Sequence, residues 1–330
     1  MCQAFNRSFR PSEQPYKRYS PQGHRFSNVS VDYAWHHHRF SIVGETAIDG
    51  KWSLATLNMF RFEAAEKLYL TLLQRHYACD YWALEGKSVS AASEVRNEQG
   101  LYWGVEWQPY YQMHLTAYAD VYRFPFLRYR VSQPSQGADA MLMACYDISE
   151  GHQLQLRYRY RMKERDVAEG YRLLQGGLVS EHTHRLRLRW AGKIASQYSC
   201  QLTGEGCMVQ AERLSAGYMG SAQLTYEPSS TAQHTFRISG GATVFSTDYA
   251  ARIYGYERGA LYAYNYQTFY GKGCRSYLLM QYSHKSAPRL SCMVKLGATC
   301  YLDRTVIGSG AAAIENNHRE DLQLQLRYTY

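Results

Sequence analysis

The feature that most constrains this chain is a strict alternation of apolar and polar residues over long segments. In residues 154–162, every even position is Leu, Tyr or Met, and every odd position is Gln or Arg. Residues 185–190 repeat the pattern in short form, and residues 321–330 end the chain with it. A period of two sends the two sets to opposite faces of a β-strand, whereas a helix would scatter both around its circumference. The sequence therefore predicts long strands with one apolar face.

Weaker alternation and turn-forming residues extend this prediction along the whole chain. Several segments run to ten residues or more, which is longer than the ~5–6 of ordinary strands and close to the ~9–11 of a tilted membrane strand. We expect strands near residues 27–35, 38–47, 52–61, 67–79, 81–91, 100–108, 112–124, 137–147, 152–163, 184–195, 197–210, 214–226, 233–246, 250–266 (as a hairpin), 274–284, 290–302 and 321–330.

The predicted fold is all-β: an up-and-down antiparallel transmembrane β-barrel of roughly 14–18 strands. Residues 1–23 form an irregular N-terminal segment in this prediction, and residues 24–330 form the barrel. In so wide a barrel the Arg, Gln and Thr set points into a watery lumen, and the Leu, Tyr and Trp set faces lipid. A large soluble β-barrel that binds a ligand is the alternative, while a propeller lacks the blade-length repeat it would need.

Composition supports strands over helices. The chain contains 31 Tyr and has a mean hydropathy of −0.48. No apolar run approaches the ~20 residues of a transmembrane helix, so helical membrane proteins are excluded. Membrane β-barrels are not excluded, because only half of the residues in each strand are apolar.

The lengths of the connections predict an orientation. Outer-membrane barrels have short periplasmic turns, long external loops and a periplasmic C-terminus. Counting back from Tyr330 places the long loop 303–320 outside and the short turn 285–289 inside, as this rule requires.

Two runs of alternating arginines are the strongest candidate functional feature, in a chain of formal net charge +9. Guanidinium groups that line a lumen wall concentrate anions and guide phosphate or carboxylate groups. The alternative is structural: each arginine pairs with a lumen carboxylate such as Glu45, Glu106 or Asp120. We call the following six residues the ladder arginines: Arg157, Arg159, Arg161, Arg185, Arg187 and Arg189.

Motifs for catalysis or metal binding are not found in the sequence. There is no GxSxG and no CxxC, and no His lies at zinc-ligand spacing beside a Cys. The spacing of the eight Cys does not assign disulfides. We therefore expect no enzyme, metal or cofactor, with a membrane-embedded lipid-modifying enzyme as the alternative.

The last strand, LQLQLRYTY, resembles the C-terminal assembly signal of outer-membrane barrels, carried here by Leu326, Tyr328 and Tyr330. Much of residues 24–330 resembles the C-terminal barrel region of Bacteroidetes helix-hairpin-helix domain-containing, competence-like proteins. The stretches that carry the resemblance are GETA at 44–47, NEQGLYWGVEWQP at 97–109, FPFLRYRV at 124–131, PSQG at 134–137, the most specific run STDYAARIYGYERGALYAYNYQTFYGKG at 246–273, TVIGSG at 305–310 and NNHR at 316–319.

This resemblance implies an exported outer-membrane barrel. The residues themselves leave two functions open: a pore or transport barrel, or a non-conducting anchor. Its partners would be outer-membrane lipid, lipopolysaccharide and the barrel-assembly machinery. In the family a signal peptide and a helix-hairpin-helix module, a candidate DNA-binding element, precede the barrel. Residues 1–23 contain neither, so we expect that this chain starts downstream of its natural beginning and that DNA or polyanion handling belongs to the missing module.

Overall fold

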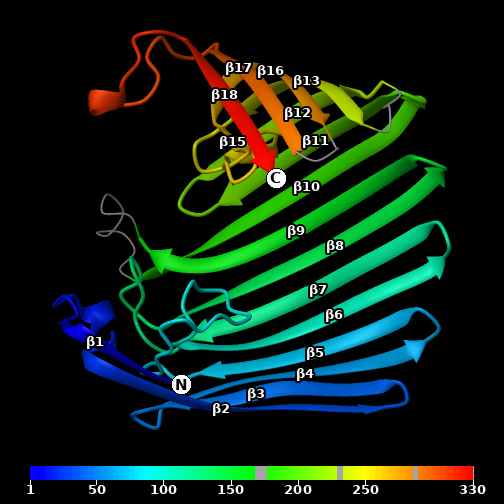
Figure 1. Cartoon of the computed structure of the whole chain (residues 1–330). Helices are drawn as coiled ribbons and strands as arrows, with labels where there is room; N and C mark the ends of the chain where they lie inside the picture. Colours follow the sequence, from blue (N-terminus) through cyan, green and yellow to red (C-terminus); the bar gives the residue numbers. More distant parts are fainter. Residues whose placement is uncertain (168–176, 229–232, 285–288, 330) are drawn as a thin grey trace. The chain divides into compact units, whose positions relative to one another are not determined.

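The computed structural model describes residues 1–167, 177–228, 233–284 and 289–329, and its strands dominate the architecture (Figure 1). The strands are β1 (Cys2–Phe9), β2 (Gly23–His37), β3 (Phe40–Asp49), β4 (Leu54–Ala65), β5 (Leu68–Tyr77), β6 (Glu98–Tyr110), β7 (Met113–Phe124), β8 (Ser135–Ser149), β9 (His152–Asp166), β10 (Leu178–Ala195), β11 (Tyr198–Gln210), β12 (Leu214–Tyr226), β13 (His234–Thr247), β14 (Ile253–Tyr256), β15 (Tyr266–Phe269), β16 (Gly271–His284), β17 (Arg289–Tyr301) and β18 (His318–Thr329).

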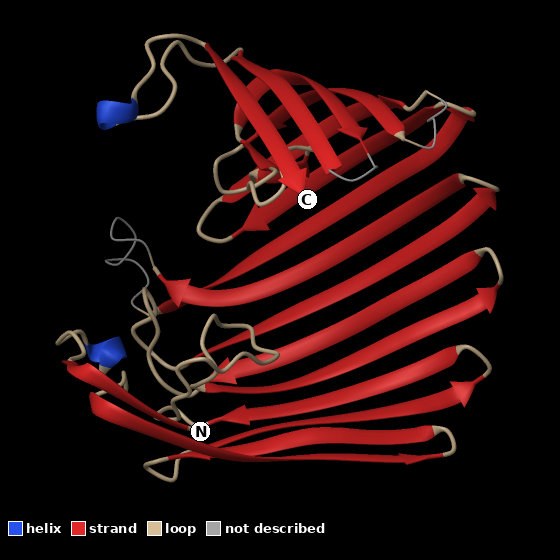
Figure 2. Ribbon diagram, in the orientation of Figure 1, coloured by secondary structure: helices blue, strands red, loops and turns tan. Residues whose placement is uncertain are grey.

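Sixteen of these strands form one sheet in sequence order, and β14 and β15 form a separate two-stranded sheet (Figure 2). This confirms the predicted all-β, up-and-down antiparallel topology and the predicted range of strand numbers. The two short helices in the described residues are the 3-10 turns η1 (Pro15–Lys17) and η3 (Gly310–Ala312). Within the described ranges, no helix has the length and apolar character needed to cross a bilayer.

Two expectations about individual segments are wrong. Residues 81–91 form no strand; they belong to the connection 78–97 between β5 and β6. The segment 1–23, expected to be irregular, contains β1, which pairs antiparallel with β2. The hairpin expected within 250–266 exists but is displaced, with Tyr256 of β14 opposite Tyr266 of β15.

Connection lengths alternate along the sheet. β2–β3, β4–β5, β6–β7, β8–β9 and β10–β11 are each joined by two residues. His38 (φ 49°) and Lys67 (φ 57°) adopt the left-handed conformation that tight hairpin turns need. The other ends of the strands carry the longer connections 78–97, 125–134, 248–270 and 302–317, together with the short connections 50–53 and 211–213. The long loop expected before the last strand is thus confirmed, whereas residues 285–288 of the expected turn at 285–289 lie outside the described residues.

The chain divides into two compact units. Unit 1 comprises residues 1–144, 159–183 and 210–212; unit 2 comprises 145–158, 184–209 and 213–330. Unit 1 has a small core of Ala47, Ala55, Tyr77 and Tyr81. Unit 2 has a larger core, which packs the connection 248–270 against the strands.

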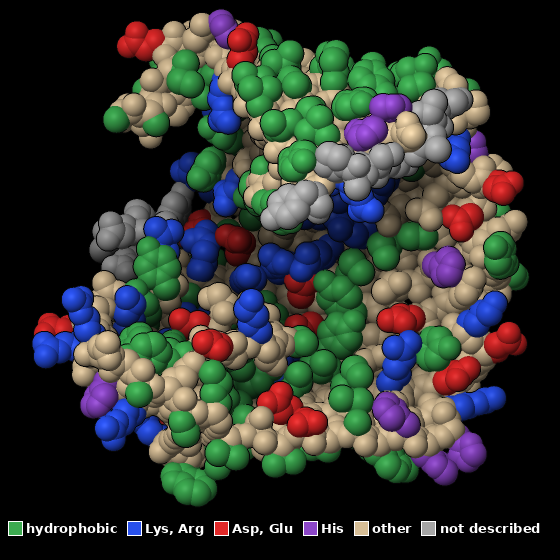
Figure 3. Space-filling view, viewed as in Figure 1, with side chains coloured by type: hydrophobic (Ala, Val, Ile, Leu, Met, Phe, Trp, Pro, Cys, Tyr) green, Lys and Arg blue, Asp and Glu red, His purple; other side chains and the backbone are tan. Residues whose placement is uncertain are grey.

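Each unit shows the two-faced strands that the alternation predicts. One face, which we call the apolar face, carries exposed large apolar residues such as Val31 (64%) in unit 1 and Leu296 (54%) in unit 2. On the opposite face, which we call the charged face, Arg75 and Lys295 are almost fully buried. Figure 3 shows hydrophobic side chains gathered over β13 and β16–β18 at the top of the view.

Candidate functional site

The ladder arginines lie on the charged face, and four of them, Arg159, Arg161, Arg185 and Arg187, pair with acidic side chains. In unit 1, Asp139 of β8 accepts a hydrogen bond at 2.6 Å from Nη2 of Arg159 and one at 3.1 Å from Nε of Arg161. Tyr118 also donates to Asp139, at 3.0 Å. Two guanidinium groups therefore share one carboxylate, and this cluster keeps a net charge of +1.

Unit 2 repeats this arrangement with Glu205 of β11. Arg187 donates to Glu205 through Nε, and Nη1 of Arg185 lies 3.4 Å from Oε1 of the same carboxylate. Arg189 donates from Nη2 to the neutral amide of Gln201 at 2.6 Å. The carboxylate of Glu205 is fully buried, while the two arginines that hold it are partly exposed. Arg185, Arg187 and Glu205 together therefore also retain a net charge of +1.

The structure brings the ladder arginines together in pairs: Arg159 with Arg161, and Arg185 with Arg187. Arg157 belongs to unit 2 and Arg159 to unit 1. The carboxylates that hold the pairs are Asp139 and Glu205. Two of the three carboxylates that we expected as partners pair with other arginines: Glu106 with Arg61, and Asp120 with Arg75. The sequence did not predict the two carboxylates that hold the pairs, Asp139 and Glu205. Both occupy odd positions, in phase with the charged face of their strands, and this phase could have identified them.

A buried ion cluster in unit 1 was not foreseen. Arg75 of β5, with a fully buried side chain, donates from Nε to Glu98 at 2.5 Å and from Nη1 to Asp120 at 2.8 Å. Glu98 also accepts the backbone N–H groups of Ala91 and Ala92. Gly100 leaves the room for this guanidinium, because a Cβ there would overlap it. The cluster fixes the connection 78–97 against the sheet.

A second buried cluster lies in unit 2. Arg275 of β16 donates to both oxygens of Glu257, at 2.7 and 3.0 Å, and to Asp321 of β18 at 2.6 Å. Nζ of Lys295, on β17, lies 2.8 Å from Oε2 of Glu257. Two cations face two carboxylates, so the charges balance. Such a cluster is stable in a buried setting only while every member is present.

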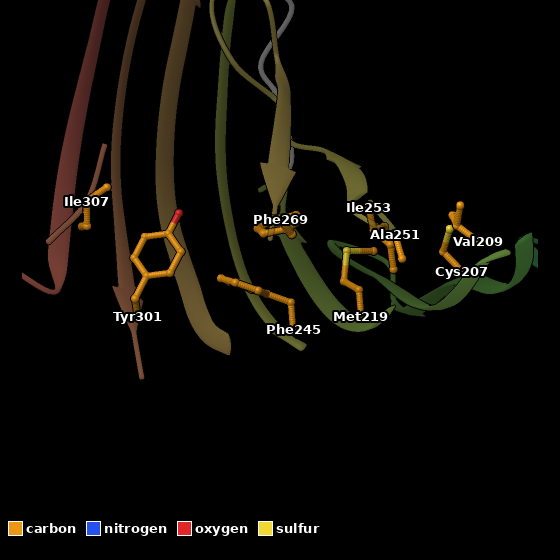
Figure 4. Close-up of a cluster of buried hydrophobic side chains, with 9 residues drawn as sticks. All are labelled: Cys207, Val209, Met219, Phe245, Ala251, Ile253, Phe269, Tyr301 and Ile307. Carbon is orange, nitrogen blue, oxygen red and sulfur yellow. The ribbon is translucent and has the colours of Figure 1, made fainter. Parts of the chain in front are cut away.

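The connection 248–270 packs on the charged face of unit 2. Phe269, Ile253 and Ala251 from this connection meet Met219, Phe245 and Tyr301 from the strands (Figure 4). Beyond this core, Gln323 accepts the N–H of Ala260, and the amide of Gln325 pairs with both backbone groups of Leu261. The strands therefore hold the connection through apolar contacts, an ion cluster and β18 amides.

Outside the strands, the connection 302–317 begins with a local ion pair. Arg304 donates from Nε to Asp303 at 2.9 Å, and this hydrogen bond holds the pKa of the Asp303 carboxyl below its usual range. Asp303 also accepts the backbone N–H of Lys272 at 3.0 Å, which ties this connection to the start of β16.

The proposed assembly signal lies on the apolar face of β18. Leu326 is 72% exposed and Tyr328 59%, and both continue the exposed row of Leu322 and Leu324. Tyr330 lies outside the described residues.

No family model matches this chain, and no curated protein matches it. Among solved structures, the chain is similar to OmpT (in-vitro folded), an outer membrane protein of Vibrio cholerae, with a TM-score of 0.42 and 8% identity, covering 99% of this chain and 94% of that one.

Proposed function

We propose that this chain is an outer-membrane β-barrel whose charged face lines a narrow passage for small anionic solutes. One observation carries the proposal: large apolar side chains are exposed in mid-strand beside buried charges. Leu296 of β17 is 54% exposed, whereas its neighbour Lys295 is fully buried. Soluble proteins rarely expose contiguous apolar patches above a few hundred Å². A lipid-facing barrel exterior needs such a surface, with the polar side chains on the opposite face.

Strand length and connection pattern support the same proposal. β8, β9 and β10 contain 15, 15 and 18 residues, enough to cross the hydrocarbon core with a tilt. Two-residue turns at one end of the strands and several long connections at the other are typical of outer-membrane barrels. Lipid and lipopolysaccharide would then contact the apolar face, and the barrel-assembly machinery would recognise Leu326 and Tyr328. We propose no catalytic role.

We expect the folded protein to require detergent and to be heat-modifiable, migrating differently in gels before and after boiling. The backbone hydrogen bonds of a closed barrel are internal, so detergent does not open them. The measurement is gel mobility alongside circular dichroism. A monomer that stays soluble without detergent would contradict the membrane assignment.

The Asp139 cluster gives the passage a testable selectivity. Asp139→Asn should raise its charge from +1 to +2 and increase anion preference, whereas Arg159→Gln with Arg161→Gln should lower it to −1 and favour cations. Fixed charges at a constriction set which ions enter, and salt screens them over ~10 Å at 0.1 M. The measurement is the reversal potential in a salt gradient across a planar bilayer, repeated at higher ionic strength. Shifts of the same sign in both variants would show that this cluster does not face the ions.

A non-conducting anchor is the second candidate, favoured by the connection 248–270, which packs on the charged face of unit 2. Absence of conductance from demonstrably folded, heat-modifiable protein would favour it. The resemblance to helix-hairpin-helix domain-containing proteins, and the polyanion or DNA handling that it implies, stays a prediction in either case.

A further inference from the structure

Unit 2 contains a cavity of about 330 Å³ between its strands and the connection 248–270. The volume lies at the lower end of the range for small-molecule sites, so the cavity suits a small ligand and not a polymer. The strands contribute Arg187, Arg189, Gln201, Thr203, Ser221 and Gln223 to its lining. The connection contributes Tyr254, Tyr256, Glu257, Arg258 and Tyr266.

The charges around this cavity favour an anion. Arg189 is exposed, and its Nη2 donates to the neutral amide of Gln201 at 2.6 Å. Arg258 is exposed, and among the described residues neither it nor Arg189 forms an ion pair with a carboxylate. The negative charge of Glu257 is already taken up by Arg275 and Lys295. Planar guanidinium groups with spare donors are suited to bidentate recognition of a carboxylate or phosphate.

The remaining lining groups narrow the ligand class. Tyr256 and Tyr266 face each other across the β14–β15 pair, with ring centroids 5.4 Å apart and planes inclined by 60°. Both residues are about half exposed, so their rings are accessible, but this inclination leaves no slot for a base sandwiched between them. Aromatic rings offer an apolar surface with a polar edge, and the amides and hydroxyls nearby donate and accept hydrogen bonds. A sugar ring presents both an apolar face and hydroxyl groups.

We propose that this cavity binds an acidic mono- or disaccharide, with its carboxylate on Arg189 and Arg258 and its ring against Tyr256 and Tyr266. Arg187 is held by Glu205 and supports the wall from which Arg189 projects. The site lies wholly within unit 2, and it goes beyond the proposed passage because binding here does not depend on conductance.

The test is calorimetric titration of the full chain in detergent with glucuronic acid, glucose and acetate. We expect glucuronic acid to bind more tightly than the other two, because only it offers both the ring and the carboxylate. Arg189→Gln combined with Arg258→Gln should weaken glucuronic acid binding by about tenfold or more, since charge-assisted hydrogen bonds are lost. Tyr266→Ala should weaken it too.

Arg319→Gln is the matched control, since Arg319 is an exposed arginine of unit 2 outside the cavity, and binding should not change. Binding that survives the double substitution would overturn the proposal. Equal affinity for acetate, which would mean a general anion site, or equal affinity for glucose would overturn it as well. These titrations require no bilayer, so their failure is distinguishable from a failure of the proposed passage.

Discussion

Glu257→Gln should lower the free energy of unfolding by about 3–5 kcal/mol, the usual cost of removing one partner from a buried ion pair. Glu257 holds Arg275 at 2.7 Å and Lys295 at 2.8 Å, and both cations are almost fully buried. The neutral amide would leave these two cations with Asp321 alone, and a buried excess charge in a low dielectric is expensive. The measurement is urea-induced unfolding in detergent micelles, followed by tryptophan fluorescence.

Glu315→Gln is the control for this prediction. Glu315 lies exposed in the connection 302–317, and removing its charge should change stability by no more than about 0.5 kcal/mol. If both variants unfold at the same urea concentration as the unmodified chain, the connection 248–270 is not clamped to the strands by its ion cluster. In that case the cavity beneath it would lose its structural basis too.

The strands were predictable because their signal is local. A period of two can be recognised within a single segment, so the alternation at 154–162 and 321–330 located β9 and β18 without any knowledge of their neighbours. The same reasoning failed at 81–91, where Tyr81, Trp82 and Val89 resemble a strand. There the hydroxyl of Tyr77 donates to the carbonyl of Val89 and Glu98 binds the backbone of Ala91, so tertiary contacts fix an irregular path.

β1 was missed for the opposite reason. Almost all of its residues are exposed, so residues 2–9 carry no apolar pattern that would mark a buried face. The segment is a strand because it pairs with β2, from Cys2 opposite Ser27 to Phe9 opposite Gly23. Strand pairing depends on two segments together, so it could not be predicted from residues 2–9 alone.

The candidate site likewise contains residues that local sequence predicts and residues that only the fold brings together. The ladder arginines could be found because they alternate within each of two strands, β9 and β10, but the carboxylates that hold four of them lie on the neighbouring strands β8 and β11, about twenty residues away in the chain. The buried clusters were harder still. Arg275 joins Glu257, 18 residues before it, to Asp321, 46 residues after it. The sheet order brings Arg275 near Asp321, and the packing of the connection 248–270 on the strands adds Glu257.

Leu296→Arg should make the free energy of folding less favourable by about 2–4 kcal/mol, which is the cost of an arginine at the bilayer midplane on a barrel exterior. Leu296 lies near the middle of β17, on the apolar face, and is opposite Leu278 of β16 and Leu322 of β18. All three leucines are at least 40% exposed, so the new guanidinium would lie on the apolar face, away from the carboxylates of the charged face. The measurement is the free energy of folding into lipid bilayers, from urea titration of heat-modifiable protein.

Leu302→Arg makes this prediction decisive, because it introduces the same substitution six residues further along. Leu302 is 76% exposed and lies just beyond β17, roughly 20 Å from Leu296 at about 3.4 Å per residue. A membrane barrel places this position near or outside the interface, where an arginine costs about 0–1 kcal/mol. In a soluble protein both positions would face water, and both substitutions would be equally harmless. A larger loss of folding free energy for Leu296→Arg than for Leu302→Arg therefore indicates that Leu296 lies in a hydrocarbon layer. Equal values for the two variants would contradict the membrane barrel and favour the soluble alternative.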